Sequence, residues 1–358
     1  MSVFKTKFMC KWVSALIFLI PLISCSFQDQ KDNLLKGRSL FIEIDDPSIH
    51  SPHLYIGNHI WFENKLWFST NFSEVVSVDT TGKIHERINL GKVEIDPSGM
   101  PVEYKSGMIT DFFLGDSEIY ALYLASDQLK KLGSGKKQSV AINLPSKEDL
   151  FFLNYRAIAP SISQNSKTLF VLSGVSGDFD SYDLNFKTHE TKPLFKGKFV
   201  PDVRSFEVTK SPSGNYILFD LGWNGIMIFD PSGVKIFDFK MPQNSAELHQ
   251  SGKEDFEKWF RLGFEELGAR IINVVGEPED LWVLVNLNPS GKANGPTDSF
   301  FILKKNKSEW DFFKIKGIDQ IDINDEGLVL ITNLKNKKVV FEIMEFDHFI
   351  SRLDYSKN

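Results

Sequence analysis

A short, very apolar segment recurs along the chain at nearly even intervals, and this repeat constrains the fold more than any other feature. The six copies begin at Leu66, Ile119, Leu169, Tyr216, Leu281 and Leu328. Their starts are separated by 53, 50, 47, 65 and 47 residues. Each copy is rich in Leu, Ile, Val, Phe or Trp and is bounded by polar residues, a pattern typical of buried β-strands.

Turn residues complete the repeating unit. A polar turn precedes each apolar segment, as in Pro212-Ser213-Gly214-Asn215, and a second turn follows two strands later. That second turn contains glycine in Asp79-Thr80-Thr81-Gly82-Lys83 and in Asp230-Pro231-Ser232-Gly233, where a hairpin requires positive φ. The unit is therefore a sheet of four short strands.

Six such units predict an all-β fold, a six-bladed β-propeller with four-stranded antiparallel blades. The last unit lacks a fourth strand after Val339–Ile343, and we expect the spare strand at Ser39–Ile44 to complete it and close the ring. Two β-sandwiches are the competing interpretation, but they do not predict six equal markers. The propeller domain is assigned to residues 39–358.

The N-terminus has the features of a secretion signal. Lys5, Lys7 and Lys11 precede an apolar stretch of about a dozen residues, too short to span a bilayer as a helix. Leu22-Ile23-Ser24-Cys25 then resembles the bacterial lipobox. This resemblance implies a signal peptide at residues 1–24 and acylation of Cys25. The alternative is an ordinary secretory signal in which Cys25 is incidental.

These assignments predict where the protein resides. Residues 25–38 are interpreted as a polar tether between the lipid and the domain. Ser26 after the acylated cysteine favours the outer membrane, on its periplasmic or outer surface. The lipid bilayer, contacted through Cys25, is thus one expected partner.

Lipobox and blades together resemble the secreted six-bladed propeller lipoproteins of bacteria, which are related in shape to NHL-repeat and YWTD-type propellers. The stretch Pro97–Tyr104, followed by Ile109-Thr110-Asp111-Phe112, resembles the linker between blades in that group. The chain shows no clean NHL signature and no Trp-Asp dipeptide at the blade ends. The resemblance therefore implies the fold without assigning an activity.

Charge narrows the classes of partner. The chain has 41 basic and 47 acidic side chains, a formal net charge of −6. Removing residues 1–24 leaves 38 basic side chains against the same 47 acidic ones, a net charge of −9. We expect no nucleic-acid partner, because phosphate backbones require a basic surface. We also expect a monomer without cofactor or metal, and a partner that is a protein or a small anionic ligand.

Long connections are expected on one face of the propeller. They are residues 91–107, 145–155, 241–269 and 288–298, whereas the turns of the other face are short. Elaborated loops on a rigid scaffold are where function concentrates. A helical insertion at about 244–268, between blades 4 and 5, begins with the capping box Ser251-Gly252-Lys253-Glu254. Its aromatic stripe predicts a lid, or alternatively a protein-docking helix, with the residues Phe256, Trp259, Phe260 and Phe264.

Two sets of polar residues are candidates for ligand binding on the innermost strands. Arg156, Arg204 and Arg270 each lie near the start of such a strand, which suits a carboxylate or phosphate ligand. They can equally form structural ion pairs with acids such as Asp111 or Glu207, which are themselves candidates for ligand binding. A second set lies eight residues before the marker of its blade and predicts a polar ring about the axis: Asn58, Asp111, Asn273 and Gln320.

Catalytic motifs are sparse. His50, His53 and His59 cluster in the first blade, but their spacing does not favour a metal site. We predict no catalytic residue. The expected function is a lipid-anchored extracytoplasmic scaffold that binds a ligand or protein through its long-loop face. The alternative is a propeller hydrolase or lyase acting on a sugar, lactone or peptide at the mouth of the channel.

Overall fold

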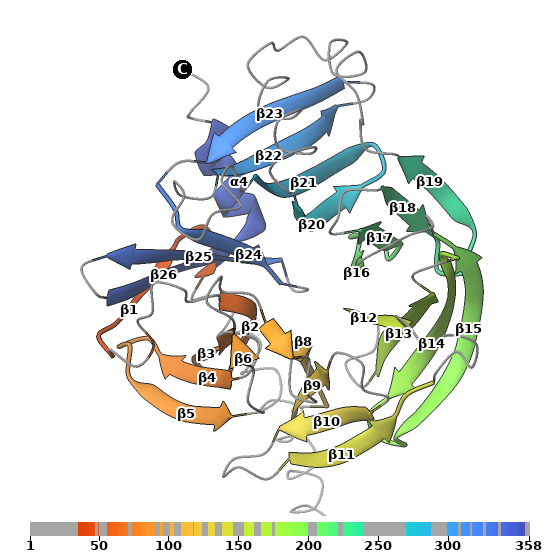
Figure 1. The fold of residues 1–358 in the computed structure, drawn as a ribbon. Helices are drawn as coiled ribbons and strands as arrows, with labels where there is room; N and C mark the ends of the chain where they lie inside the picture. Colours follow the sequence, from red (N-terminus) through yellow and green to blue (C-terminus); the bar gives the residue numbers. More distant parts are fainter. Residues whose placement is uncertain are drawn as a thin grey trace, which may run out of the picture.

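The computed structural model contains six four-stranded antiparallel sheets arranged as blades around a central axis, which confirms the predicted propeller (Figure 1). The structure describes residues 35–354 except 47–48, 50–55, 71–73, 90–93, 96–100, 104–108, 117, 124–127, 133–137, 146–153, 161–165, 174–175, 200–205, 221–224, 240–269, 288–298, 307–308, 316, 325–326 and 336–337.

Each blade contains an innermost, a second, a third and an outermost strand. The innermost strands are β2 (Ile56–Phe62), β8 (Ile109–Gly115), β12 (Asn154–Pro160), β16 (Phe206–Lys210), β20 (Arg270–Glu277) and β24 (Gln320–Ile323). The second strands, which carry the six predicted markers, are β3 (Lys65–Thr70), β9 (Glu118–Tyr123), β13 (Ser166–Ser173), β17 (Tyr216–Asp220), β21 (Asp280–Leu287) and β25 (Leu328–Lys335).

The outer half of each blade is built in the same order. The third strands are β4 (Glu74–Asp79), β10 (Gln128–Leu132), β14 (Asp178–Asn185), β18 (Ile226–Phe229), β22 (Ser299–Asn306) and β26 (Lys338–Glu345). The outermost strands are β5 (Ile84–Asn89), β11 (Gln138–Asn143), β15 (Glu190–Lys198), β19 (Lys235–Phe239), β23 (Glu309–Ile315) and, in blade 6, β1 (Leu40–Ile44). A two-stranded hairpin, β6 (Glu94–Ile95) with β7 (Pro101–Glu103), lies between blades 1 and 2 in sequence.

Strand β1 closes the ring as predicted. It pairs antiparallel with β26, so that Leu40 lies opposite Ile343 and Ile44 lies opposite Val339. Blade 6 is thus assembled from both ends of the domain, and its outer edge is covered by a strand from the N-terminal side.

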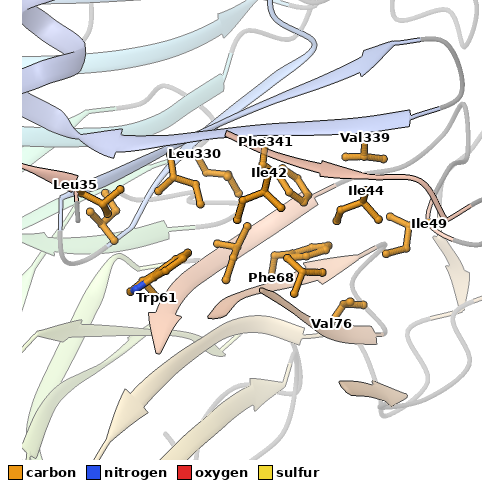
Figure 2. Close-up of a cluster of buried hydrophobic side chains, with 14 residues drawn as sticks. Leu35, Ile42, Ile44, Ile49, Trp61, Phe68, Val76, Leu330, Val339 and Phe341 are labelled. Atoms are coloured by element: carbon orange, nitrogen blue, oxygen red, sulfur yellow. The ribbon is translucent and has the colours of Figure 1, made fainter. Parts of the chain in front are cut away.

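The seam between blade 6 and blade 1 is filled by one apolar cluster (Figure 2). Phe68 and Phe341 are fully buried there, with ring centroids 4.8 Å apart in an edge-to-face contact. Leu35 is also buried in this cluster, so packing of the domain begins within the segment assigned as tether.

The hairpin glycines have the predicted conformation. Gly82 and Gly233 have φ angles of 82° and 88°. Gly82 also contacts the closing strand, because a Cβ atom at this position would lie 1.9 Å from the carbonyl oxygen of Glu43. The turn of blade 1 therefore fits against β1 only with glycine at this position.

A helix near the C-terminus was not predicted from the sequence. Helix α4 (Phe346–Asp354) follows β26 directly and buries Phe349 and Leu353 against the cluster between blades 5 and 6. The insertion predicted at about 244–268, between blades 4 and 5, lies outside the described residues.

Candidate functional site

The predicted polar ring lies on the innermost strands, as the spacing implied. Asn58 is on β2, Asp111 on β8, Asn273 on β20 and Gln320 at the start of β24. In β2, β8 and β20 the pairing register with the second strand shifts beside the ring residue. These irregularities change the direction of side chains at one level of the innermost strands.

Two of the ring residues contact each other. Asn58 of blade 1 donates a hydrogen bond from Nδ2 to Oδ1 of Asp111 in blade 2. An amide donor and a carboxylate acceptor make a charge-assisted bond, which is stronger than a bond between neutral groups. This pair therefore joins blades 1 and 2 near the axis.

Asn273 turns towards the neighbouring blade. Its side chain is buried, and Nδ2 donates to the carbonyl oxygen of Ile323 on β24. Its Oδ1 atom has no hydrogen-bond partner within the described chain. Gln320 is half-buried and lies opposite Thr332. The ring is thus assembled in part, with Asn58 and Asp111 in contact and Asn273 bonded to a backbone carbonyl.

The structure reveals a pair that sequence reasoning missed. His59 on β2 is buried, and its Nδ1 lies 2.8 Å from Oδ2 of Asp322 on β24. Its Nε2 lies 3.1 Å from the carbonyl oxygen of Leu328. Asn324 donates from Nδ2 to the carbonyl oxygen of His59 at 3.2 Å. His59 therefore joins blade 1 to blade 6.

No local sequence motif indicates this pair, since His59 and Asp322 are 263 positions apart. The signal available in the sequence was the ring closure itself, which makes β2 and β24 neighbours. His50 and His53 lie outside the described residues. Within the described chain no three His, Cys, Asp or Glu side chains come together to hold a metal ion.

Two of the three predicted arginines can be placed by their backbone. Arg156 is the third residue of β12, opposite Val171, and Arg270 is the first residue of β20, opposite Asn286. Both positions are at the end of the propeller where the innermost strands begin. Glu207 lies half-buried on β16, opposite Phe219. The remaining predicted residues lie outside the described chain: Cys25, Arg204, Phe256, Trp259, Phe260 and Phe264.

The placed polar groups of the innermost strands act as links between blades. The carboxylates of Asp111 and Asp322 each bond to a side chain of the adjacent blade. Thr209 on β16 adds a further link, since its hydroxyl donates to the carbonyl oxygen of Val274 at 2.8 Å. Such contacts fix the blades relative to one another. No helix of the described chain is long and apolar enough to cross a membrane.

Comparisons with known proteins find structural likenesses at low sequence identity. No protein-family model matches the sequence, and a search of curated proteins finds no match. A solved member of the DUF4221 family from Bacteroides vulgatus is 14% identical, with coverage of 86% of this chain and 97% of that one and a TM-score of 0.48.

Two further solved structures are similar at the same level. A virginiamycin B lyase from Staphylococcus aureus is 11% identical, covering 86% of this chain and all of that one (100%), with a TM-score of 0.45. Regucalcin from Agrobacterium tumefaciens, described as a calcium-binding protein, is 13% identical, covering 85% and 94%, with a TM-score of 0.46.

Proposed function

We propose that the protein is a lipid-anchored extracytoplasmic scaffold that binds an anionic ligand at the end where its innermost strands begin. The observation that supports this most directly is the register of Arg156 and Arg270, which stand near the first residues of β12 and β20. Blades 3 and 5 thus each bring one guanidinium-bearing residue to the same end of the ring.

The charge of the chain makes this pair distinctive. The formal net charge is −6, so the surface as a whole repels anions. Arginine recognises carboxylate and phosphate groups through two parallel hydrogen bonds, which gives both affinity and orientation. An anion is therefore the ligand that this end of the ring suits best.

Binding is tested with the Arg156→Gln and Arg270→Gln variants, titrated with citrate as a probe in a calorimeter. We expect the double variant to bind citrate at least about tenfold more weakly, a loss of about 1.4 kcal/mol. Arg87→Gln is the matched control, because Arg87 is on outer strand β5 and lies 3.1 Å from Asp46. Equal affinity in the double variant and the control would end the proposal.

Whether the natural ligand is cleaved distinguishes a scaffold from an enzyme. Ligand that co-purifies with the protein is identified by mass spectrometry. The isolated ligand is then incubated with the protein and analysed again. An intact ligand supports the scaffold, whereas a cleaved one supports the hydrolase or lyase alternative.

The anchor is tested separately by labelling cells with radioactive palmitate. We expect label on the wild-type protein and none on Cys25→Ala, because acylation requires the cysteine thiol. Label retained by the variant would disprove lipidation at this position.

A further inference from the structure

The chain enters the propeller at the face where innermost strands end in short turns, here called the short-turn face. Strand β1 begins opposite the end of β26, since Leu40 pairs with Ile343. Strand β26 in turn ends opposite the start of β25, because Glu345 pairs with Leu328. The short turn that closes on Leu328 begins at Asn324, whose backbone nitrogen donates to the Leu328 carbonyl oxygen at 3.0 Å. The N-terminal segment therefore joins the domain at the short-turn face of blade 6.

Contacts with helix α4 hold the entering segment at this face. The backbone nitrogen of Phe346, the first residue of α4, donates to the carbonyl oxygen of Gly327 in the same short turn at 2.9 Å. Ser39, which precedes β1, lies beside the helix, because Arg352 donates to its hydroxyl oxygen at 3.2 Å. The Ser39 hydroxyl donates to Sδ of Met344 at 3.8 Å. The start of β1 and helix α4 are thus neighbours at the short-turn face.

Leu35 shows where the chain becomes part of the core. It is 1% exposed and belongs to the apolar cluster of the seam. Figure 2 shows Leu35 at the end of the cluster that holds Trp61 and Leu330, whereas Val339 lies at the other end. Trp61 is the last residue but one of β2, and Leu330 is the third residue of β25, so both are near the short-turn face. Packing therefore holds position 35 at this face.

The length of chain between Cys25 and Leu35 limits where a membrane that holds Cys25 can lie. The two residues are ten positions apart. A fully extended chain covers at most about 3.6 Å per residue, so this segment reaches at most about 36 Å. The eight residues of innermost strand β20 give the domain a thickness of about 26 Å along its axis. A membrane at the far face would leave only about 10 Å of reach, so the short-turn face is the one that the anchor brings to a bilayer.

Basic side chains gather near the point of entry. Lys36 and Arg38 are exposed and lie directly before β1. Arg352 is 47% exposed and adds a third positive charge, which its contact with Glu342 partly offsets. Asp347 is an exposed acid on the first turn of α4. In a chain with a formal net charge of −6, this local excess of positive charge is complementary to anionic lipid headgroups.

We propose that the short-turn face around α4 rests on anionic lipid headgroups of the membrane that holds Cys25, an inference that builds on the acylated cysteine of the proposed function. The end of the ring that carries Arg156 and Arg270 then faces away from the bilayer. An anionic ligand reaches that end from the aqueous phase. The ligand class is thus a soluble anion rather than a lipid of the same membrane.

The orientation is tested by energy transfer from the two ends of one strand. Lys187 is exposed in the short turn after β14, and Asp178 is the exposed first residue of β14 at the opposite face. Lys187→Cys and Asp178→Cys each receive a donor dye. The protein is purified with its anchor and reconstituted in vesicles of phosphatidylcholine and phosphatidylglycerol that contain a rhodamine-labelled lipid. We expect transfer from position 187 to be at least about twofold more efficient, because the eight-residue strand separates the two dyes by up to about 26 Å.

Equal transfer from the two positions would mean that the rim of the ring lies on the membrane. More efficient transfer from position 178 would put the arginine end there, and either result would overturn the proposal. The wild-type protein is the labelling control, because acylation blocks the thiol of Cys25. Dye on wild-type Cys25, or failure of the wild type to float with vesicles in a density gradient, would instead disprove the anchor, and the orientation would fall with it.

The contact with headgroups is tested by reversing charge at the point of entry. Lys36→Glu combined with Arg38→Glu should at least about halve the difference in transfer between the two positions, and vesicles without phosphatidylglycerol should do the same. Lys192→Glu combined with Lys198→Glu is the matched control, because both lysines are exposed on outermost strand β15, away from the entry point. A difference that survives both the charge reversal and the loss of anionic lipid would contradict the headgroup contact.

Discussion

The seam between blades 6 and 1 and the boundary between blades 3 and 4 differ in what their basic side chains contact. At the seam, His59 of blade 1 lies 2.8 Å from Asp322 of blade 6. Within blade 6, Lys338 contacts Glu43 at 2.6 Å, and Arg352 of α4 contacts Glu342. At the other boundary, Lys210 rests on the ring of Tyr216. Basic and acidic side chains are paired where the ring closes, whereas Lys210 lies over an aromatic ring.

The apolar part of the seam provides the largest expected effect. Phe341→Ala should lower the free energy of unfolding by about 3–5 kcal/mol, because Phe341 is fully buried against Phe68. Chemical denaturation monitored by tryptophan fluorescence measures the loss. Phe41→Ala on the adjacent strand is the control and should change little, since 61% of Phe41 is exposed. Similar losses in the two variants would show that the seam is not the cooperative core we describe.

The charged part of the seam comes next. His59→Leu should cost about 1.5–3 kcal/mol, because it breaks a buried hydrogen bond to a carboxylate and leaves Asp322 with less support. A double-mutant cycle with Asp322→Asn measures the coupling. Strictly additive effects would mean that the two side chains do not cooperate in closing the ring.

The hairpin turns of blades 1 and 4 allow the two regions to be compared through the pH dependence of their contribution to stability. Asp79 accepts bonds from the Thr81 hydroxyl at 2.6 Å and from His85 at 2.7 Å, and these hold its pKa far below the ordinary value. In the corresponding turn of blade 4, the Ser232 hydroxyl and the backbone nitrogen of Val234 lower the pKa of Asp230.

A carboxylate with a lowered pKa stabilises the fold above its unfolded pKa of about 4, and this contribution is lost as pH falls below that value. Unfolding titrations of Asp79→Asn should therefore show a shallower fall in stability between about pH 5 and pH 2 than the wild type. Asp230→Asn should show the same change to a smaller extent, because its turn has no histidine donor. An equal or larger change in Asp230→Asn would contradict this ranking.

The smallest expected change in stability is that of Lys210→Met, within about 0.5 kcal/mol at neutral pH. A lysine with a lowered folded pKa loses its proton in the native state first, so stability should rise with pH between that pKa and about 10.4. This rise should be absent from the variant when both proteins are unfolded by urea at a series of alkaline pH values. A rise of the same size in both would assign it to other groups.

Much of the fold could be predicted because the repeat is a local property. Each apolar marker reports a second strand, and glycines such as Gly82 and Gly233 report the hairpins. Closure by β1 also followed, because the last repeat lacked one strand. Helix α4 was missed although Phe346, Phe349 and Leu353 have helical spacing.

The site was predictable only where strand position is enough. Counting from the markers placed Asn58 and Asp111 on neighbouring innermost strands, where they bond. It could not find His59 with Asp322, which meet only after the ring closes. Nor could it distinguish Lys210 from other lysines, because that depends on the Tyr216 ring and on the acids that happen to lie elsewhere.

Closure by β1 also sets the order of events during synthesis. Glu43 and Lys338, which meet across the closing pair, are separated by 295 positions. Strand β1 leaves the ribosome early, yet its partner β26 is made almost last. Blades 1 to 5 use consecutive strands and can form as the chain emerges, but the N-terminal strand must wait with its backbone groups unpaired. The time from the start to the end of translation is thus the interval in which this chain most needs protection from aggregation.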